Sequence, residues 1–295
     1  MTKTFPRFHV VDVFAERRYA GNPLAVVLGC DDLDDATMQS IAAETNYSET
    51  TFVVPAPEPD GGWRVRLFTP ARELDFAGHP ILGTAWVIRR YLANEADVMQ
   101  LNLPRARVEV KFEQDGHSET LWFRAPPVEA GAICAREPMA AALGLAVADI
   151  DERAPIRRYA AGTAAMVVPL RSLDALRRSR LDLDAYAPLL AAGLPPLIYQ
   201  CCTETRAAGN DLSARFFFEA HGVREDPATG NGAAFLGAWL LAHRWLGEGD
   251  LDLRIEQGHE VRRPSLVRLR ARRTPAGDEI FVGGRVIPAF VGELA

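Results

Sequence analysis

Lysine is nearly absent from this chain of 295 residues. Only Lys3 and Lys111 occur, so arginine supplies the other 31 of the 33 basic side chains. Lys3 lies in the leading tail and Lys111 in the strand-like stretch VEVKFE. Both are poor candidates for a Schiff base, which argues against pyridoxal-phosphate chemistry. The pattern G-x-x-x-x-G-K-[ST] is missing, which excludes a P-loop nucleotide site.

Cysteine and histidine are also few, and their spacing does not suit a metal ion. The four cysteines are Cys30, Cys134, Cys201 and Cys202, and no two of them form a C-x-x-C pair. The six histidines show neither H-E-x-x-H nor H-x-x-E-H spacing. We therefore expect no zinc site, and we expect the thiols to be small buried groups in a reducing compartment.

Long apolar runs and a strong positive charge are missing as well. The longest apolar run, from Gly232 to Ala242, is too short to span a bilayer, and the start MTKTFPRF lacks the apolar core of a signal peptide. The net charge of −6 argues against nucleic acid or an anionic membrane as the main partner. We expect a soluble, cytoplasmic protein, and its 48% hydrophobic residues suffice for one large core or two ordinary ones.

Strand patterns alternate with a few helix patterns along the chain. Strands are predicted over 8–14, 24–28, 50–54 and 63–68, where β-branched and aromatic residues gather. A short helix is predicted over 34–45, ended by Asn46 in a left-handed conformation. A second helix, with Pro80 at its first position, is predicted over 80–92 and should be largely buried.

The second half of the sequence repeats the order of the first. Three short matches carry this reading: Gly162 to Val168 with Gly21 to Val27, Arg215-Phe-Phe with Arg66-Leu-Phe, and Asp226-Pro-Ala with Asp75-Phe-Ala. They predict a duplicated α+β fold, in which each half is a strand-rich sheet around one buried helix. The final strands, over 280–291, have no counterpart before Phe8 and are expected to return to the first half. The halves are then 1–125 plus 280–295, and 126–279.

Two similar halves commonly leave a ligand cleft between them, which directs attention to polar residues at matching places. Gly78 and His79 lie in a turn directly before the second predicted helix. A helix N-terminus offers free N–H groups and a positive dipole end to a carboxylate or a developing enolate, and Gly78 permits close backbone approach. A plain loop-to-helix joint is the alternative, and it is favoured for this motif taken alone.

The stretch from Asp226 to Gly232 also leads into an apolar helix, so its backbone donors would form the opposite wall of an anion site. The alternative role for Asp226 is a turn or capping carboxylate. Glu49 lies between the first predicted helix and the strand 50–54. Partial burial would raise its pKa and make it a proton carrier near neutrality, whereas a solvent-facing loop acid is the alternative.

Together these motifs resemble the phenazine-biosynthesis PhzF-like isomerase family of the diaminopimelate-epimerase-like superfamily. The matching stretches are V-D-V-F at 11–14, G-N-P-L-A-V-V at 21–27, N-Y-S-E-T at 46–50, F-A-G-H-P at 76–80, E-D-P-A-T-G-N at 225–231, and Gln257 to Ser265. The resemblance implies two halves of diaminopimelate-epimerase-like fold with the active site in the cleft between them.

The resemblance also implies roles for individual residues. Glu49 matches the glutamate that moves a proton, His79 and Asp226 match its flanking polar residues, and Gly78 matches a backbone contact. Gly230 and Asn231 are the further expected substrate-binding residues, although Asn231 stands where the best-known members carry serine, which leaves the substrate open. Arg262 likewise replaces a usual glycine.

The superfamily also contains racemases that use two cysteines, and those positions align with Ala77 and Ala228 in this chain. Two-thiol racemisation is therefore not expected. The resemblance implies a homodimeric isomerase, without metal or organic cofactor, that shifts a proton on a small carboxylate such as trans-2,3-dihydro-3-hydroxyanthranilate. The alternatives are an epimerase or isomerase of an unrelated small acid, which Asn231 favours, and a non-catalytic ligand-binding relative.

Overall fold

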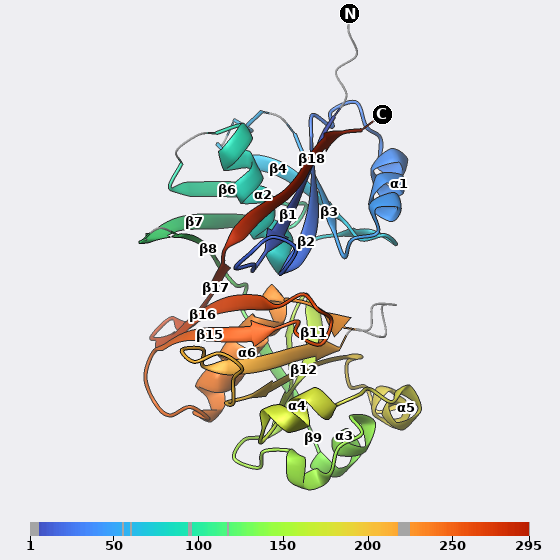
Figure 1. Cartoon of the computed structure of the whole chain (residues 1–295), viewed down its shortest axis with the longest axis vertical. Helices are drawn as coiled ribbons and strands as arrows, with labels where there is room; N and C mark the ends of the chain where they lie inside the picture. Colours follow the sequence, from blue (N-terminus) through green and yellow to red (C-terminus); the bar gives the residue numbers. More distant parts are fainter. Residues whose placement is uncertain are drawn as a thin grey trace, which may run out of the picture. The chain divides into compact units, whose positions relative to one another are not determined.

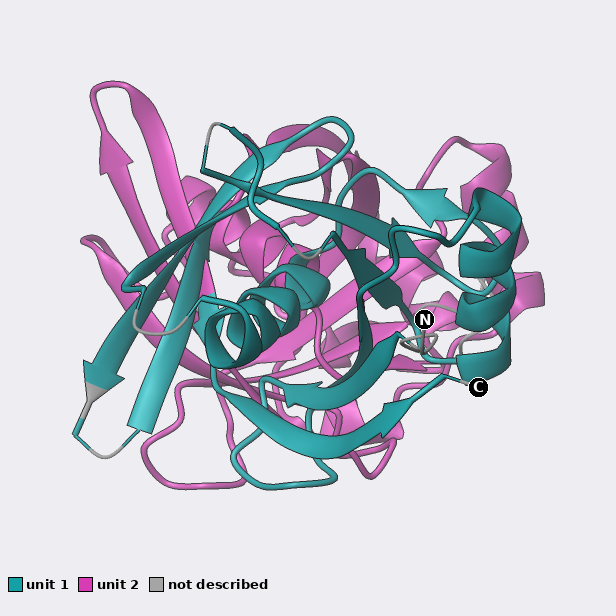
Figure 2. Cartoon of the chain, turned by 90° about the horizontal axis from the view of Figure 1, so that it is seen from above, with its two compact units in different colours: residues 1–124, 283–295 teal, residues 125–282 magenta. Residues whose placement is uncertain are grey.

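The computed structural model describes residues 6–54, 56–59, 61–93, 96–116, 118–217 and 225–294. The chain divides into two compact units, coloured separately in Figure 2. Unit 1 comprises Met1–Arg124 and Gly283–Ala295, and unit 2 comprises Ala125–Val282. The sequence analysis placed the corresponding boundaries after residue 125 and before residue 280.

Unit 1 is a mixed sheet with one long helix packed against it (Figure 1). Its elements are β1 (Arg7–Val13), β2 (Asn22–Leu28), α1 (Asp35–Thr45), β3 (Thr50–Val53), β4 (Trp63–Phe68), β5 (Glu73–Leu74), α2 (Gly78–Tyr91), β6 (Val98–Asn102), β7 (Arg107–Asp115), β8 (Ser118–Arg124) and β18 (Val286–Glu293). The strands pair in the order β18-β1-β2-β3-β4-β6-β7-β8, with β5 added to β4. Only β2–β3 and β4–β6 are parallel among these pairs. Helix α2 contacts most of these strands, so it forms the centre of the core.

Local sequence accounts for both helices of unit 1. The carboxylate of Asp34 accepts a hydrogen bond from the Thr37 N–H at 2.8 Å at the start of α1, and Asn46 ends the helix with φ 53° as predicted. Helix α2 begins at Gly78, two residues earlier than predicted, because the chain turns helical as soon as it leaves the extended Ala77. His79 therefore lies inside the first turn of α2, and Pro80 is the third helical residue.

Unit 2 has a similar sheet around its own long helix. Its elements are β9 (Glu129–Cys134), α3 (Arg136–Ala142), the 3₁₀ helix η1 (Val147–Asp149), β10 (Ile156–Ala161), β11 (Thr163–Pro169), α4 (Leu173–Arg178), α5 (Leu183–Ala191), β12 (Leu197–Cys202), β13 (Leu212–Phe217), β14 (Glu225–Asp226), α6 (Gly230–His243), β15 (Leu251–Gln257), β16 (Ser265–Thr274) and β17 (Gly277–Gly284), whose last two residues belong to unit 1. Helix α6 is buried on nearly every side, as its uniformly apolar sequence requires.

The pairing order of unit 2 repeats that of unit 1. Strands β9-β10-β11-β12-β13-β15-β16 follow one another as β18-β1-β2-β3-β4-β6-β7 do, and the parallel pairs β11–β12 and β13–β15 fall at the same places. The predicted duplication of the fold is therefore confirmed. Strand β18 pairs with β1, so the chain end returns to the first half as expected. The strand of unit 2 that corresponds to β18 is β9, which pairs with β10 as β18 pairs with β1. This counterpart lies at the start of the second half of the chain.

Matching ion pairs fix the residue-by-residue alignment of the units. Arg66 on β4 binds Glu73 on β5 through two hydrogen bonds of 2.7 Å. Arg215 on β13 binds Glu225 on β14 through bonds of 3.1 and 2.7 Å. The sequence match of Arg66 with Arg215 is therefore correct.

The third sequence match is wrong by one residue. Because Glu73 corresponds to Glu225, Asp226 corresponds to Leu74 and not to Asp75. The N-cap residue of α2, Ala77, likewise corresponds to the N-cap of α6, Thr229, and not to Ala228. More residues separate Phe217 from Glu225 than separate Phe68 from Glu73, and three-residue matches could not locate that insertion.

Candidate functional site

Glu49 and His79 lie side by side in unit 1. Glu49 directly precedes β3, His79 is the second residue of α2, and 3.4 Å separates Oε2 of Glu49 from Nε2 of His79. The Glu49 side chain is 16% exposed and the His79 side chain 6% exposed. The structure thus brings together two of the residues singled out in the sequence, and Glu49 has the partial burial that the sequence analysis named as the condition for a proton carrier.

The alternation of β3 explains why Glu49 reaches the helix. Residues two apart in a strand point to the same side of the sheet. Thr51 shares the side of Glu49, and its Oγ1 lies 2.8 Å from Oγ1 of Thr84 on α2. That contact fixes β3 against α2 at a point five residues beyond His79, so Glu49, two residues before Thr51, meets the first turn of α2.

Asn22 completes this group from β2, and the sequence analysis gave it no role. Its Nδ2 lies 3.3 Å from Nδ1 of His79, and the side chain is fully buried. The only sequence signal was its position in the stretch G-N-P-L-A-V-V. Its contact with His79 depends on pairing across residues 57 positions apart, which a single sequence does not reveal.

Burial controls the charge of His79. Desolvation lowers the pKa of its imidazole to about 3 from the usual 6.5, so His79 is neutral near pH 7. A neutral imidazole beside a carboxylate donates or accepts hydrogen bonds without adding a full positive charge. Gly78, the first residue of α2, is buried next to it, and no described side chain caps this helix end.

Asp226 anchors a separate polar group in unit 2. The hydroxyl of Thr229 donates to its Oδ2, and the Gln257 amide donates to the Asp226 carbonyl at 3.0 Å and to the Thr229 hydroxyl at 3.2 Å. All three side chains are buried. Sequence reasoning missed Thr229 and Gln257, although Gln257 begins the last of the family-like stretches.

The turn after β15 packs against this group and explains one departure from the family pattern. Gly258 has φ +76°, and a Cβ there would stand 2.4 Å from the carbonyl oxygens of Pro227 and Arg263. Arg262 has φ +60°, the left-handed region that favours glycine. The glycine that the resemblance leads us to expect here would adopt this conformation without strain, whereas Arg262 bears the strain in this chain.

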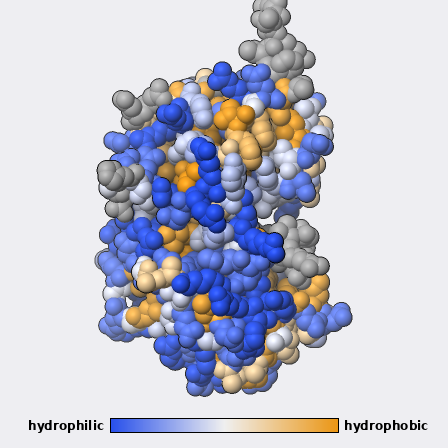
Figure 3. Space-filling view, in the orientation of Figure 1, coloured by the Kyte–Doolittle hydropathy of each residue, from blue (hydrophilic) through white to orange (hydrophobic). Residues whose placement is uncertain are grey.

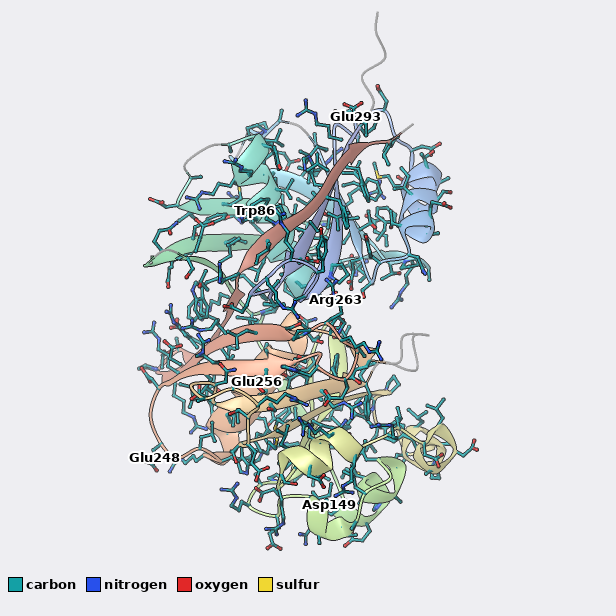
Figure 4. The ribbon with its side chains drawn as sticks, in the orientation of Figure 1. Trp86, Asp149, Glu248, Glu256, Arg263 and Glu293 are labelled. Carbon is teal, nitrogen blue, oxygen red and sulfur yellow. The ribbon has the colours of Figure 1, made fainter. Side chains whose placement is uncertain are left out.

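Buried Glu256 holds the strand that carries Gln257. Its carboxylate accepts hydrogen bonds from the Arg206 and Ala207 N–H groups at 2.9 and 2.8 Å and from the Asn210 amide at 2.7 Å. Figure 4 labels Glu256 on β15 and Arg263 beyond its end. The face of unit 2 around β15 and β16 is mostly hydrophilic in Figure 3.

Gly230 and Asn231 open helix α6 as Gly78 and His79 open α2. The residues predicted for the site thus fall into two sets. Glu49, Gly78 and His79 belong to unit 1, whereas Asp226, Gly230 and Asn231 belong to unit 2. Across the described residues, no group of three or more His, Cys, Asp or Glu side chains is arranged to hold a metal ion. No helix in the described ranges could span a membrane.

Comparisons with known proteins identify the family of this chain. The family described as phenazine biosynthesis-like protein (PhzC-PhzF) matches residues 11–291. The chain is 37% identical over 277 residues to trans-2,3-dihydro-3-hydroxyanthranilate isomerase of Pseudomonas aeruginosa, covering 93% of this chain and 92% of that protein. It is 35% identical over 305 residues to an uncharacterized isomerase of Mesorhizobium japonicum, covering 96% of each.

Solved structures show the same fold. A PhzF-family protein of Bacillus anthracis superimposes with a TM-score of 0.91 at 24% identity, covering 99% of this chain and all of that one. A hydroxyproline epimerase of Agrobacterium vitis superimposes with a TM-score of 0.63 at 13% identity, covering 100% and 93%. The fold is therefore the diaminopimelate-epimerase-like one expected from the sequence. The chain belongs to the phenazine biosynthesis-like (PhzC-PhzF) family and is an isomerase.

Proposed function

We propose that this isomerase shifts a proton within a small carboxylate-bearing molecule without a cofactor. Glu49 takes a proton from an activated carbon and returns it elsewhere on the same molecule. The observation that carries the proposal is the pair of Glu49 and His79, 3.4 Å apart, partly buried and at the start of a helix. A carboxylate in such surroundings is suited to general acid–base work.

The helix ends supply the binding contacts in this proposal. Helix α2 begins with Gly78 and helix α6 begins with Gly230. The free N–H groups at each of these helix starts bind the anionic oxygens of the substrate in this proposal. His79 and Asp226 assist proton transfer, and Asn231 contacts the substrate.

The substrate that we propose is trans-2,3-dihydro-3-hydroxyanthranilate or a related compound, because a relative at 37% identity is named for its isomerisation. Asn231 supports a second candidate, an isomerase or epimerase of another small acid. Asparagine offers an amide where the resemblance leads us to expect a serine hydroxyl, and a changed hydrogen-bonding group changes which substrate is held.

The test offers trans-2,3-dihydro-3-hydroxyanthranilate to the wild-type protein and to Glu49→Gln, with the ultraviolet absorbance of the conjugated ring as the readout. Conversion by the wild type and none by the folded variant is the expected result. Glu44→Gln is the matched control, because it makes the same glutamate-to-glutamine change at an exposed position of α1. A folded Glu49→Gln variant with full turnover would refute the role of Glu49.

A panel of chiral hydroxy and amino acids in deuterated water tests the second candidate. Uptake of deuterium by one of them, without conversion of the first compound, identifies an epimerase of a different acid. A ligand that binds and is recovered unchanged would instead indicate a binding protein.

We also propose a homodimer, as the family resemblance implies. Phe290 and Val291 on β18 are 55% and 60% exposed, and Figure 3 shows an apolar patch over this strand. Exposed apolar patches commonly mark contact surfaces. Sedimentation of a monomer at micromolar concentration would contradict this proposal.

A further inference from the structure

Asn22 is held in place by a tight turn. Its neighbour Gly21 has φ +68°, and a Cβ there would stand 2.3 Å from the carbonyl oxygen of Val13. Asn22 itself is the first residue of β2, pairs with Val13, and is fully buried. The turn and the strand pairing therefore fix the backbone position from which the Asn22 side chain extends.

The pleat of β2 directs Asn22 to the start of α2. Leu24, two residues on, shares its side of the sheet and packs against α2, with Cδ2 2.6 Å from the place a Cβ would take on Gly83. His79 lies four residues, or about one helical turn, before Gly83, so the two residues lie on the same side of α2. Asn22 lies two residues before Leu24 on the same side of β2. This spacing brings the Asn22 amide within 3.3 Å of the His79 ring.

The direction of that hydrogen bond follows from the chemistry of the two atoms. The atom of Asn22 that faces His79 is Nδ2, which carries two hydrogens and cannot accept. Nδ1 of His79 must therefore accept. A neutral imidazole carries one hydrogen, which is then on Nε2, the nitrogen 3.4 Å from Glu49 Oε2.

We propose that Asn22 is a positioning residue that fixes His79 in its Nε2–H tautomer, so that the imidazole presents an N–H group to the Glu49 carboxylate, 3.4 Å away, and takes no proton from it. This inference rests on the proposed function, in which Glu49 carries the proton. A bare Nε2 would compete for that proton, whereas an Nε2–H group orients the carboxylate and leaves the proton on it. The burial that keeps His79 neutral acts in the same direction.

Nuclear magnetic resonance of wild-type protein labelled with ¹⁵N-histidine decides the tautomer directly. Two-bond nitrogen–proton correlations near neutral pH distinguish a protonated ring nitrogen from a bare one, and the His79 signals are those lost in His79→Gln. We expect a protonated Nε2 and a bare Nδ1. A protonated Nδ1 with a bare Nε2, or a doubly protonated ring, would overturn the inference. This readout needs no substrate and is unaffected by failure of the proposed function.

Two variants of Asn22 extend the test. Asn22→Asp offers only an acceptor to Nδ1, so we expect a protonated Nδ1 and a kcat lowered by at least about tenfold with little change in KM, because a wrong tautomer loses its bond to the reacting group. Asn22→Leu keeps the volume without the donor. Thr163→Val, at the equivalent place in unit 2, should leave the His79 spectrum unchanged. An Asn22→Asp protein with the wild-type spectrum and kcat would contradict the proposal, and the wild-type spectrum decides even if a variant does not fold.

Discussion

Unit 1 and unit 2 share a strand order and a buried helix, yet they carry different side chains at the start of that helix. The positions of Asn22, Glu49 and His79 in unit 1 are taken in unit 2 by Thr163, Leu197 and Asn231. Leucine and asparagine cannot carry a proton near neutral pH. The carboxylate–imidazole pair of Glu49 and His79 is therefore present in unit 1 and has no equivalent at the matching positions of unit 2.

The reverse holds for the polar group of unit 2. The positions of Asp226, Thr229 and Gln257 are taken in unit 1 by Leu74, Ala77 and Leu103. The polar group of unit 2 thus lies at positions that are apolar in unit 1, whereas the group of unit 1 is replaced in unit 2 by residues that do not titrate. The scaffold tolerates both, because strand pairing and core volume maintain the fold while individual side chains vary. The duplication supplied two helix ends, and the substitutions made them unequal.

The largest effect is expected when Glu49, the proposed proton carrier, is replaced by the residue at the equivalent position of unit 2. Glu49→Leu installs the residue of the equivalent position, Leu197, and should lower kcat by about a hundred- to ten-thousand-fold through loss of general acid–base catalysis. Circular dichroism should show an unchanged fold. Glu44→Leu, on the exposed side of α1, should keep its activity. Full turnover by folded Glu49→Leu would mean that the difference between the units has no catalytic meaning.

The matched ion pairs should differ in strength. Arg215 and Glu225 are 4% and 5% exposed, whereas Arg66 and Glu73 are 24% and 34% exposed. Glu225→Gln removes the nearer counter-charge of a buried guanidinium and leaves Glu260, whose Oε2 lies 3.9 Å from Arg215 Nε. It should lower the free energy of unfolding by about 3–5 kcal/mol. Glu73→Gln should cost about 0–1 kcal/mol. Urea unfolding measures both changes in free energy, and equal changes would show that burial does not make one ion pair stronger than the other.

The glycines before β2 and β11 offer a backbone comparison. Gly21 and Gly162 have φ +68° and +75°, but a Cβ on Gly21 would meet Val13 O at 2.3 Å, whereas a Cβ on Gly162 meets nothing within 4 Å. Gly162→Ala should therefore cost only the left-handed strain of about 1–2 kcal/mol. Gly21→Ala should cost about 1–3 kcal/mol more from the clash. Thermal unfolding of both variants checks the order, and a milder effect at Gly21 would contradict it.

The last comparison concerns stability in acid. The pKa of His79 is about 3 in the folded protein and 6.5 as its unfolded reference, so its stabilising contribution is complete above pH 6.5 and is lost as the pH falls toward 3. The loss amounts to at most about 1.4 kcal/mol for each pH unit within this range. His79→Asn copies the non-titrating residue of unit 2 and should flatten the curve of unfolding free energy against pH. Parallel curves for the two proteins would show that His79 is not protonated on unfolding.

Elements with local signals were predictable from the sequence. Helix α1 has Asp34 and Asn46 at its ends, and both act as their side chains suggest. The strands from β1 to β4 follow β-branched runs and appear within a residue or two of the predicted bounds. Glu49 and His79 were found because the motifs around them match a family. The start of α2 was misplaced, because Gly78 and His79 carry no local mark of a helix.

Long-range pairing decided the rest. Asn22, Thr229 and Gln257 gain their roles from partners in other elements, and no periodicity in one sequence reports such contacts. The one-residue error at Asp226 has the same origin, since an insertion is located by the register of β13 with β14 and not by three matching letters. Residue identity thus determined which chemistry this protein can perform. The tertiary structure decided which side chains meet, because strand register and helix packing set those distances across the whole chain.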